Sequence, residues 1–178
     1  MSNDFAFCPA CGGKNIHNIN NRKWICTDCG FDLYNNTAAA VGCIICNANS
    51  EVLFEVREKE PRKGFLALPG GFIDPDESAE DAAVRECKEE LDAKIKSTEY
   101  LCSFPNTYLY RGITYKTCDL FFTADLSEGT VFHTQKKEVQ SVTWKKITSK
   151  ADLDALPLAF ESARFALEKW LLKKGVQQ

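Results

Sequence analysis

Hydrophobic and polar positions divide the chain into two parts with different patterns. Residues 1–36 contain hardly any long apolar run, whereas an apolar run at 38–46 is followed by alternating apolar positions at 52–56. Alternation with a period of two residues predicts strands, here two strands joined by a turn. We therefore predict a small first unit at 1–36 and a main domain at 37–178.

The remaining pattern predicts an α/β domain that mixes strands and helices. Further strand patterns span residues 95–103, 115–126 and 139–147. Apolar residues at helical spacing predict helices over 78–91 and 157–174. Ser78 is a suitable N-cap for the first helix, and Arg111-Gly112 is a suitable turn between two strands.

Length, composition and charge then narrow the class of protein. The 178 residues are 44% hydrophobic, and 22 Lys and Arg stand against 25 Asp and Glu, a net charge of -3. This balance gives no overall attraction to nucleic acid or to an anionic membrane. No stretch approaches the ~20 apolar residues that cross a bilayer, and the N-terminus lacks a signal-peptide pattern. We therefore expect a cytoplasmic protein without a membrane partner.

Nine cysteines are unusual for a compartment in which thiols stay reduced, so clustered cysteines indicate metal ligands. Four of them form two Cys-x-x-Cys pairs near the N-terminus, namely Cys8, Cys11, Cys26 and Cys29. Gly12 and Gly30 follow the pairs and permit tight turns around the sulfurs. A redox pair is the alternative, but a redox Cys-x-x-Cys normally opens a helix. We predict a zinc ribbon whose four thiolates leave no open position, so that the zinc is structural.

The other cysteines are predicted to be buried thiols that act as small hydrophobic residues. Cys43 and Cys46 repeat the Cys-x-x-Cys spacing, yet residues three apart in a strand point to opposite faces. They therefore should not bind one metal ion together. The same interpretation applies to Cys87, Cys102 and Cys118.

An acidic helix face carries the candidate chemistry. At 3.6 residues per turn, Glu86, Glu89 and Glu90 lie on one face of the helix predicted over 78–91. Like charges at these spacings repel one another, so three carboxylates together indicate a bound cation. Oxygen ligands select Mg²⁺ or Mn²⁺ rather than zinc. The alternative is a solvated acidic stripe with Arg85 as its counter-ion.

The residues around this helix resemble the signature of the Nudix hydrolase family. In that signature five residues separate a glycine from a glutamate, and seven residues separate that glutamate from an Arg-Glu pair. Two further residues separate the Arg-Glu pair from a Glu-Glu pair. The matching residues here are Gly71, Glu77, Arg85, Glu86, Glu89 and Glu90. Asp92 stands where the family has glycine and Cys87 where it has an aliphatic residue. The resemblance extends over residues 38–147.

The resemblance implies a fold and a reaction. The family fold is an α/β/α sandwich with a mixed sheet, here preceded by the zinc ribbon. The reaction is hydrolysis of the pyrophosphate bond in a nucleoside diphosphate derivative, with Mg²⁺ or Mn²⁺ as cofactor.

The resemblance also implies roles for individual residues of the site. Glu86 and Glu90 would be the principal metal ligands, with Glu89 and the backbone carbonyl of the Gly71 region as further ones. Glu77 and Arg85 would form an ion pair that orients the helix. The general base is left open between Glu86 and Glu138.

A four-cysteine ribbon before such a domain is similar to the NADH pyrophosphatase branch of the family. That branch carries a Ser-Gln-Pro-Trp-Pro-Phe-Pro element, of which residues 103–108 retain only a Ser, an aromatic residue and a Pro. NADH, NAD and ADP-ribose are therefore all candidate substrates. Candidate substrate-binding residues are Arg57, Phe104, Tyr108 and Tyr115. Aromatic residues in strands are commonly core residues, so we expect at least two of Phe104, Tyr108, Tyr110 and Tyr115 to be buried.

The alternative function is a non-catalytic sensor that binds a nucleotide and uses the ribbon to contact a partner or a nucleic acid. Such a sensor is expected to lose the acidic trio, which is intact here. The ribbon has three basic residues but also three Asp, so it lacks a phosphate-binding stripe and we do not expect nucleic acid as a partner. The expected partner is a small-molecule nucleoside diphosphate derivative, and the resemblance permits a homodimer.

Overall fold

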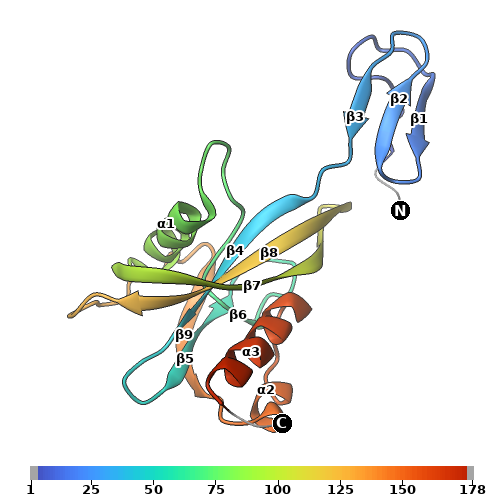
Figure 1. The fold of residues 1–178 in the computed structure, drawn as a ribbon. Helices are drawn as coiled ribbons and strands as arrows, with labels where there is room; N and C mark the ends of the chain where they lie inside the picture. Colours follow the sequence, from blue (N-terminus) through green and yellow to red (C-terminus); the bar gives the residue numbers. More distant parts are fainter. Residues whose placement is uncertain (1–3, 176–178) are drawn as a thin grey trace.

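The computed structural model describes residues 4–175 and consists of a small ribbon and a larger α/β domain (Figure 1). The ribbon holds strands β1 (Ile16–Ile19), β2 (Lys23–Cys26) and β3 (Asp32–Tyr34), which pair antiparallel in that order. The segment after β3 leads directly into β4 (Ala38–Ile45), the first strand of the larger domain. In Figure 1 the ribbon stands apart from the sheets and helices that follow.

The larger domain contains a mixed sheet and a second, antiparallel one. β4 pairs in parallel with β8 (Ile113–Leu126), and β8 pairs antiparallel with β7 (Ile95–Tyr110). β5 (Glu51–Arg57) lies between β6 (Leu66–Ala67) and β9 (Val139–Lys146), antiparallel to both. The expected mixed sheet is therefore confirmed.

Helices cover both faces of these strands, which gives the expected α/β/α sandwich (Figure 1). α1 (Ala79–Leu91) packs with one side of β4, through Cys43 and Ile45. α3 (Glu161–Lys173) packs on the opposite side, where Ile44 belongs to a separate cluster. α2 (Lys150–Asp154) is a short helix that also contributes to this second cluster. Successive side chains of a strand point to opposite faces, so a strand that is covered on both faces contributes to two separate cores in one domain.

Local signals in the sequence set the ends of α1. The Ser78 side chain accepts a hydrogen bond from the Asp81 backbone N–H, so the predicted N-cap is confirmed. Asp92 ends the helix in the left-handed conformation, with φ of 55°, where the family signature has glycine. Asp tolerates this conformation better than most residues.

Several expectations about the second half of the chain were wrong. Strand β7 continues to Tyr110, through residues 104–110 that carried no strand prediction, and α2 was missed. Pro105 is accommodated because β7 is an edge strand of its sheet. The final helix begins at Glu161 rather than at 157. The turn at Arg111-Gly112 is confirmed, with φ of 49° and 81° at its two residues.

The burial predictions gave a mixed outcome. Cys43 and Cys87 are buried, and Cys43 and Cys46 pack with opposite core clusters as expected. Cys118 is exposed, because it alternates with the inward-facing residues of β8. None of the four aromatic residues Phe104, Tyr108, Tyr110 and Tyr115 is buried, because β7 and the start of β8 form a hairpin at the edge of the sheet. No helix within residues 4–175 is long and apolar enough to span a membrane.

Candidate functional site

A glycine loop lies against β4 and forms one wall of the site. The Val41 N–H donates to the Gly71 carbonyl at 2.8 Å, and the Cys43 N–H donates to the Pro69 carbonyl at 2.8 Å. A Cβ atom on Gly70, whose φ is +148°, would lie 2.1 Å from the Val41 carbonyl oxygen. A Cβ atom on Gly71 would lie 2.5 Å from a Glu86 carboxylate oxygen. The position of Gly70 therefore requires glycine, and Gly71 brings the backbone close to the Glu86 carboxylate, which a side chain there would displace.

Glu90 is the most deeply placed carboxylate of α1. Its side chain accepts a hydrogen bond from the Gly70 backbone N–H at 2.8 Å, and the residue is 8% exposed. Burial, together with the nearby charges of Glu86 and Glu138, raises the pKa of Glu90 to about 8. Burial also raises the pKa of Glu86, against the lowering effect of its Arg85 partner. The two carboxyl groups therefore lie in an environment that favours a positive counter-charge.

Glu55 on β5 is a site residue that the sequence analysis missed. It is 4% exposed, and its Oε1 atom has no hydrogen-bond partner. Burial and the adjacent Glu90, with which its carboxyl group shares a hydrogen bond, raise the pKa of Glu55 well above the ordinary value. The sequence did contain a signal for Glu55. It lies two positions after Leu53, so in a strand both side chains share one face, and Leu53 belongs to the core cluster that packs against α1.

Arg85 connects the carboxylates of the helix to the preceding loop. Its guanidinium donates to both oxygens of Glu77 at 2.7 and 2.8 Å, and to the Phe72 carbonyl at 3.0 Å. It also contacts Glu86 at 2.8 Å and Glu89 at 3.2 Å. The structure thus contains the expected pair of Glu77 and Arg85. Glu89 is about half exposed and lies outside the cavity described next.

A cavity of about 420 Å³ lies beside these residues. Of the sequence-predicted site residues, those that line it are Gly71, Glu86, Glu90, Glu138, Arg57 and Tyr108. Phe104 and Tyr115 do not line it. Phe104 packs against Phe165 on α3, and Tyr115 contacts the Phe72 ring. Phe104 instead lines a second cavity that adjoins this one, whereas Tyr115 lines neither, so the assignment of both residues as substrate contacts stays a prediction.

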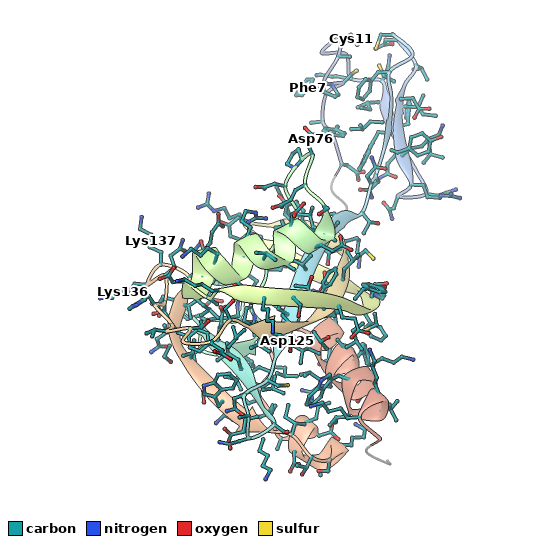
Figure 2. All side chains as sticks on the ribbon, turned by 60° about the vertical axis from the view of Figure 1, so that its left-hand side comes forward. Phe7, Cys11, Asp76, Asp125, Lys136 and Lys137 are labelled. Carbon is teal, nitrogen blue, oxygen red and sulfur yellow. The ribbon has the colours of Figure 1, made fainter. Side chains whose placement is uncertain are left out.

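Glu138 enters the site from the segment before β9. It forms an ion pair with Lys59, and both residues line the cavity. The preceding Lys136 and Lys137 extend outward from the domain (Figure 2). Glu138 is therefore a carboxylate that reaches the cavity from outside α1.

The lining of the cavity also includes a buried polar group that the sequence analysis missed. Asp119 on β8 accepts hydrogen bonds from the hydroxyls of Thr117 and Ser162, both at 2.6 Å. All three residues are buried and line the cavity. Phe160 and Tyr108 form an aromatic wall nearby, with ring centroids 5.8 Å apart.

The acidic end of the cavity fits a hard divalent cation. Its donor atoms are carboxylate and backbone carbonyl oxygens, which Mg²⁺ and Mn²⁺ prefer. Glu86 and Glu90 line the cavity together with Gly71, and the absence of a Cβ on Gly71 leaves room for the Glu86 carboxylate.

The cysteines of the ribbon form a second candidate metal site. The sulfur atoms of Cys8, Cys11, Cys26 and Cys29 all lie within 4.8 Å of one another. The Sγ atoms of Cys8 and Cys29 are 3.7 Å apart, and those of Cys11 and Cys26 are 3.8 Å apart. A tetrahedron with Zn–S bonds of about 2.3 Å has its sulfurs about 3.8 Å apart. The cluster therefore has the dimensions of a zinc site.

Comparison with known proteins agrees with this geometry. A sequence model of the NUDIX domain matches residues 36–167. The chain is 28% identical over 175 residues to a NAD-capped RNA hydrolase, NudC, of Pseudomonas syringae pv. tomato. The matched region covers 95% of this chain and 56% of that protein. The chain is 27% identical over 161 residues to a NAD-capped RNA hydrolase of Schizosaccharomyces pombe, covering 79% of this chain and 43% of that protein. The chain thus spans about half the length of these curated relatives.

Two solved structures show the same fold. A NUDIX hydrolase from Nitrosomonas europaea superposes with a TM-score of 0.67 at 25% identity, over 97% of this chain and 93% of that one. The NUDIX domain of Shewanella oneidensis NrtR, solved in complex with ADP ribose, superposes with a TM-score of 0.61 at 26% identity. That match covers 78% of this chain and 88% of the other.

Proposed function

We propose that this chain, which belongs to the NUDIX domain family, is a pyrophosphohydrolase acting on a nucleoside diphosphate derivative. One observation carries the proposal: Glu86, Glu90 and Glu138 line a single cavity together with aromatic and polar side chains. A cavity of about 420 Å³ is within the range that holds small ligands. A non-catalytic sensor has no need of three carboxylates at one end of such a cavity.

A divalent cation, Mg²⁺ or Mn²⁺, would be held by Glu86 and Glu90, with the Gly71 carbonyl and Glu89 as further donors. Bound there, the cation supplies charge neutralisation for the diphosphate and lowers the pKa of a bound water. The Gly71 carbonyl already accepts one hydrogen bond from Val41, which leaves it one further acceptor position. Glu89 has to turn inward from its exposed position to take part.

The protein's own residues then have distinct roles in the proposed reaction. Arg85 and Glu77 are positioning residues, because the bidentate pair fixes the start of α1 and turns Glu86 toward the loop. Glu55 adjoins Glu90 and does not line the cavity, so it acts on Glu90 rather than on the substrate. Glu86 and Glu138 both face the cavity, so either can accept the proton of the attacking water.

Substrates of dinucleotide size suit the surroundings of this site. A second, open cavity of about 1000 Å³ adjoins the first and shares with it Asn106, Tyr108, Thr117 and Phe160. NADH, NAD and ADP-ribose are the candidates, and the names of the relatives add NAD at the end of an RNA. Each contains a diphosphate between two ring-bearing halves.

In the ribbon we propose a structural Zn²⁺ bound by Cys8, Cys11, Cys26 and Cys29. Two matching turns support it: the Gly12 N–H donates to the Cys8 carbonyl at 2.8 Å, and the Gly30 N–H donates to the Cys26 carbonyl at 3.0 Å. Four thiolates leave no open position for a substrate.

A substrate panel tests the proposed function. Purified protein with Mg²⁺ or Mn²⁺ is incubated with NADH, NAD, ADP-ribose and a NAD-capped RNA, and both products are identified by mass. We expect metal-dependent cleavage between the two phosphorus atoms of at least one substrate. An inactive Glu86→Gln protein serves as the control for contaminating hydrolases. No cleavage of any member, with both metals at saturation, contradicts the proposal.

A further inference from the structure

The buried end of the cavity has the chemistry of a specificity site. Thr117, Asp119 and Phe121 alternate along β8, so their side chains share the face that lines the cavity. Asp119 is 8% exposed, Thr117 2% and Ser162 1%. This end is therefore an enclosed polar floor, separate from the carboxylates of α1.

The floor presents acceptors rather than donors to whatever occupies the cavity. Thr117 donates its hydroxyl proton to Oδ1 of Asp119, and Ser162 donates its hydroxyl proton to Oδ2. A carboxylate has about four acceptor positions, so both oxygens keep capacity for another hydrogen bond. None of the ion pairs found within residues 4–175 involves Asp119.

The wall beside this floor suits a planar ring. Phe160 and Tyr108 meet at 5.8 Å with an angle of 45° between their planes. The Arg57 guanidinium lies 5.1 Å from the centre of the Phe160 ring, and its Nε atom donates to the Pro61 carbonyl. Aromatic faces and a guanidinium plane stack on flat rings with little preference among them, so selection must come from the floor.

We propose that Asp119, oriented by Thr117 and Ser162, accepts a hydrogen bond from an amino group on a planar ring of the substrate. This inference rests on the proposed function and deepens it, because it names the chemistry by which that site selects its substrate. Two rings carry such a group, adenine with its exocyclic amine and nicotinamide with its carboxamide. Asp119 is then a specificity residue, on β8 rather than on the helix that carries Glu86 and Glu90.

Paired substrates that differ only in this group test the proposal. ADP-ribose is compared with its hypoxanthine counterpart, in which a carbonyl replaces the adenine amine, and NADH with the analogue that carries a carboxylate in place of the carboxamide. For the unmodified protein we expect kcat/KM to favour one amino-bearing member by about tenfold or more, as for a hydrogen bond to a charged group. In Asp119→Asn that ratio should fall toward one or invert, because the Asn amide can donate to a carbonyl.

Controls separate recognition from folding and from catalysis. Asp125→Asn makes the same substitution on the same strand, at an exposed residue that lines neither cavity, and should leave the ratio unchanged (Figure 2). Ser162→Ala removes one hydroxyl donor and should reduce the ratio by a smaller factor, which provides the test if Asp119→Asn does not fold. The change is expected in KM, with the metal concentration for half-maximal activity unchanged.

The outcomes distinguish the two proposals. Loss of discrimination in the adenine pair, or in the nicotinamide pair, supports the inference and identifies the ring. Unchanged ratios in both pairs, for folded Asp119→Asn and Ser162→Ala, overturn it while the hydrolase assignment stands. No hydrolysis by the unmodified protein is a failure of the proposed function itself.

Discussion

Between Asp4 and Tyr34 only Cys8, Trp24 and Cys26 are buried, whereas the domain that follows buries two clusters of side chains on opposite faces of its strands. Cys8 and Cys26 are therefore both candidate ligands and two of the three buried residues of the ribbon, while Cys11 and Cys29 are exposed. In the larger domain the candidate ligands are carboxylates: Glu90 and its neighbour Glu55, which is not itself a candidate ligand, are buried at a cost in free energy, and the apolar clusters hold them in place. The comparison shows that candidate metal ligands can stand where a core is nearly absent in one region and depend on a core in another.

The largest effect should follow from removing the zinc. We expect about one zinc per chain by elemental analysis. In Cys26→Ser the ribbon should unfold, because structural zinc sites contribute about 10 kcal/mol or more to folding. Hydrogen exchange should show lost protection in residues 4–34 and retained protection in β4, β8 and α1. Cys118→Ser, an exposed thiol outside the cluster, is the matched control.

Two results would contradict this prediction. One is a protein without zinc in which Cys8 and Cys11 form a disulfide. The other is an equal loss of protection in both regions, which would show that the division near residue 36 is wrong.

The second effect concerns the carboxylates that the core holds in place. Glu90→Gln keeps the shape of the side chain but removes a ligand charge, so we expect hydrolysis to fall by about 100-fold or more. The melting temperature should stay the same or rise, since a buried acid is replaced by a neutral amide. Glu89→Gln, at an exposed position, should lose much less activity. If Glu86→Gln and Glu90→Gln proteins both keep the full rate in saturating Mg²⁺, the acidic face of α1 is a solvated stripe and not a metal site.

Replacing Arg85 should have a smaller effect on activity. Arg85→Lys keeps the charge but loses the two parallel hydrogen bonds to Glu77, so we expect a 10- to 100-fold loss in activity, of the size seen for residues that orient metal ligands. The concentration of metal for half-maximal activity should rise as well, which a change in substrate contact alone does not produce. Arg164→Lys, in α3 and outside both cavities, is the control. An unchanged metal requirement would show that Arg85 does not position Glu86.

The smallest effect is a pH dependence of stability in protein that contains zinc but no added Mg²⁺ or Mn²⁺. Burial raises the pKa of Glu90 from 4.5 to about 8, so the folded protein holds a proton that the unfolded chain releases. The contribution of Glu90 to stability is therefore complete below about pH 4.5 and is lost as the pH rises toward 8. Urea unfolding between pH 5 and pH 8 measures this decline, which Glu90→Gln should flatten. A steeper decline in Glu90→Gln than in the unmodified protein would contradict the assignment.

Much of the site could be predicted from local spacing. Glu86 and Glu90 lie one helical turn apart, and the loop before them contains Gly70, at a position where a Cβ atom would clash with the backbone of β4. The four cysteines form two short pairs, so their convergence needs only one hairpin. In these places neighbours in sequence are neighbours in space.

Other parts of the site depend on contacts between distant elements. Glu138 meets Lys59 across 79 positions of the chain, and Ser162 meets Asp119 across 43. Phe104 and Tyr115 looked equivalent to Tyr108 in sequence, yet the packing of α3 and the register of β7 against β8 turn only Tyr108 into the cavity. Alternation along a strand shows that residues share a face but not what that face meets.

By itself, the sequence determined the local chemistry of this protein: two sets of candidate metal ligands of different type, an acidic helix with its caps, and most of the strands and helices. Ligand atoms, helical periodicity and turn residues are local properties, and they act before the chain is compact. Only the tertiary structure decided that Glu55 adjoins Glu90 and that Asp119 lines the cavity. These contacts come from strand order and helix packing, which are set by the burial of apolar area over the whole domain rather than by any single segment.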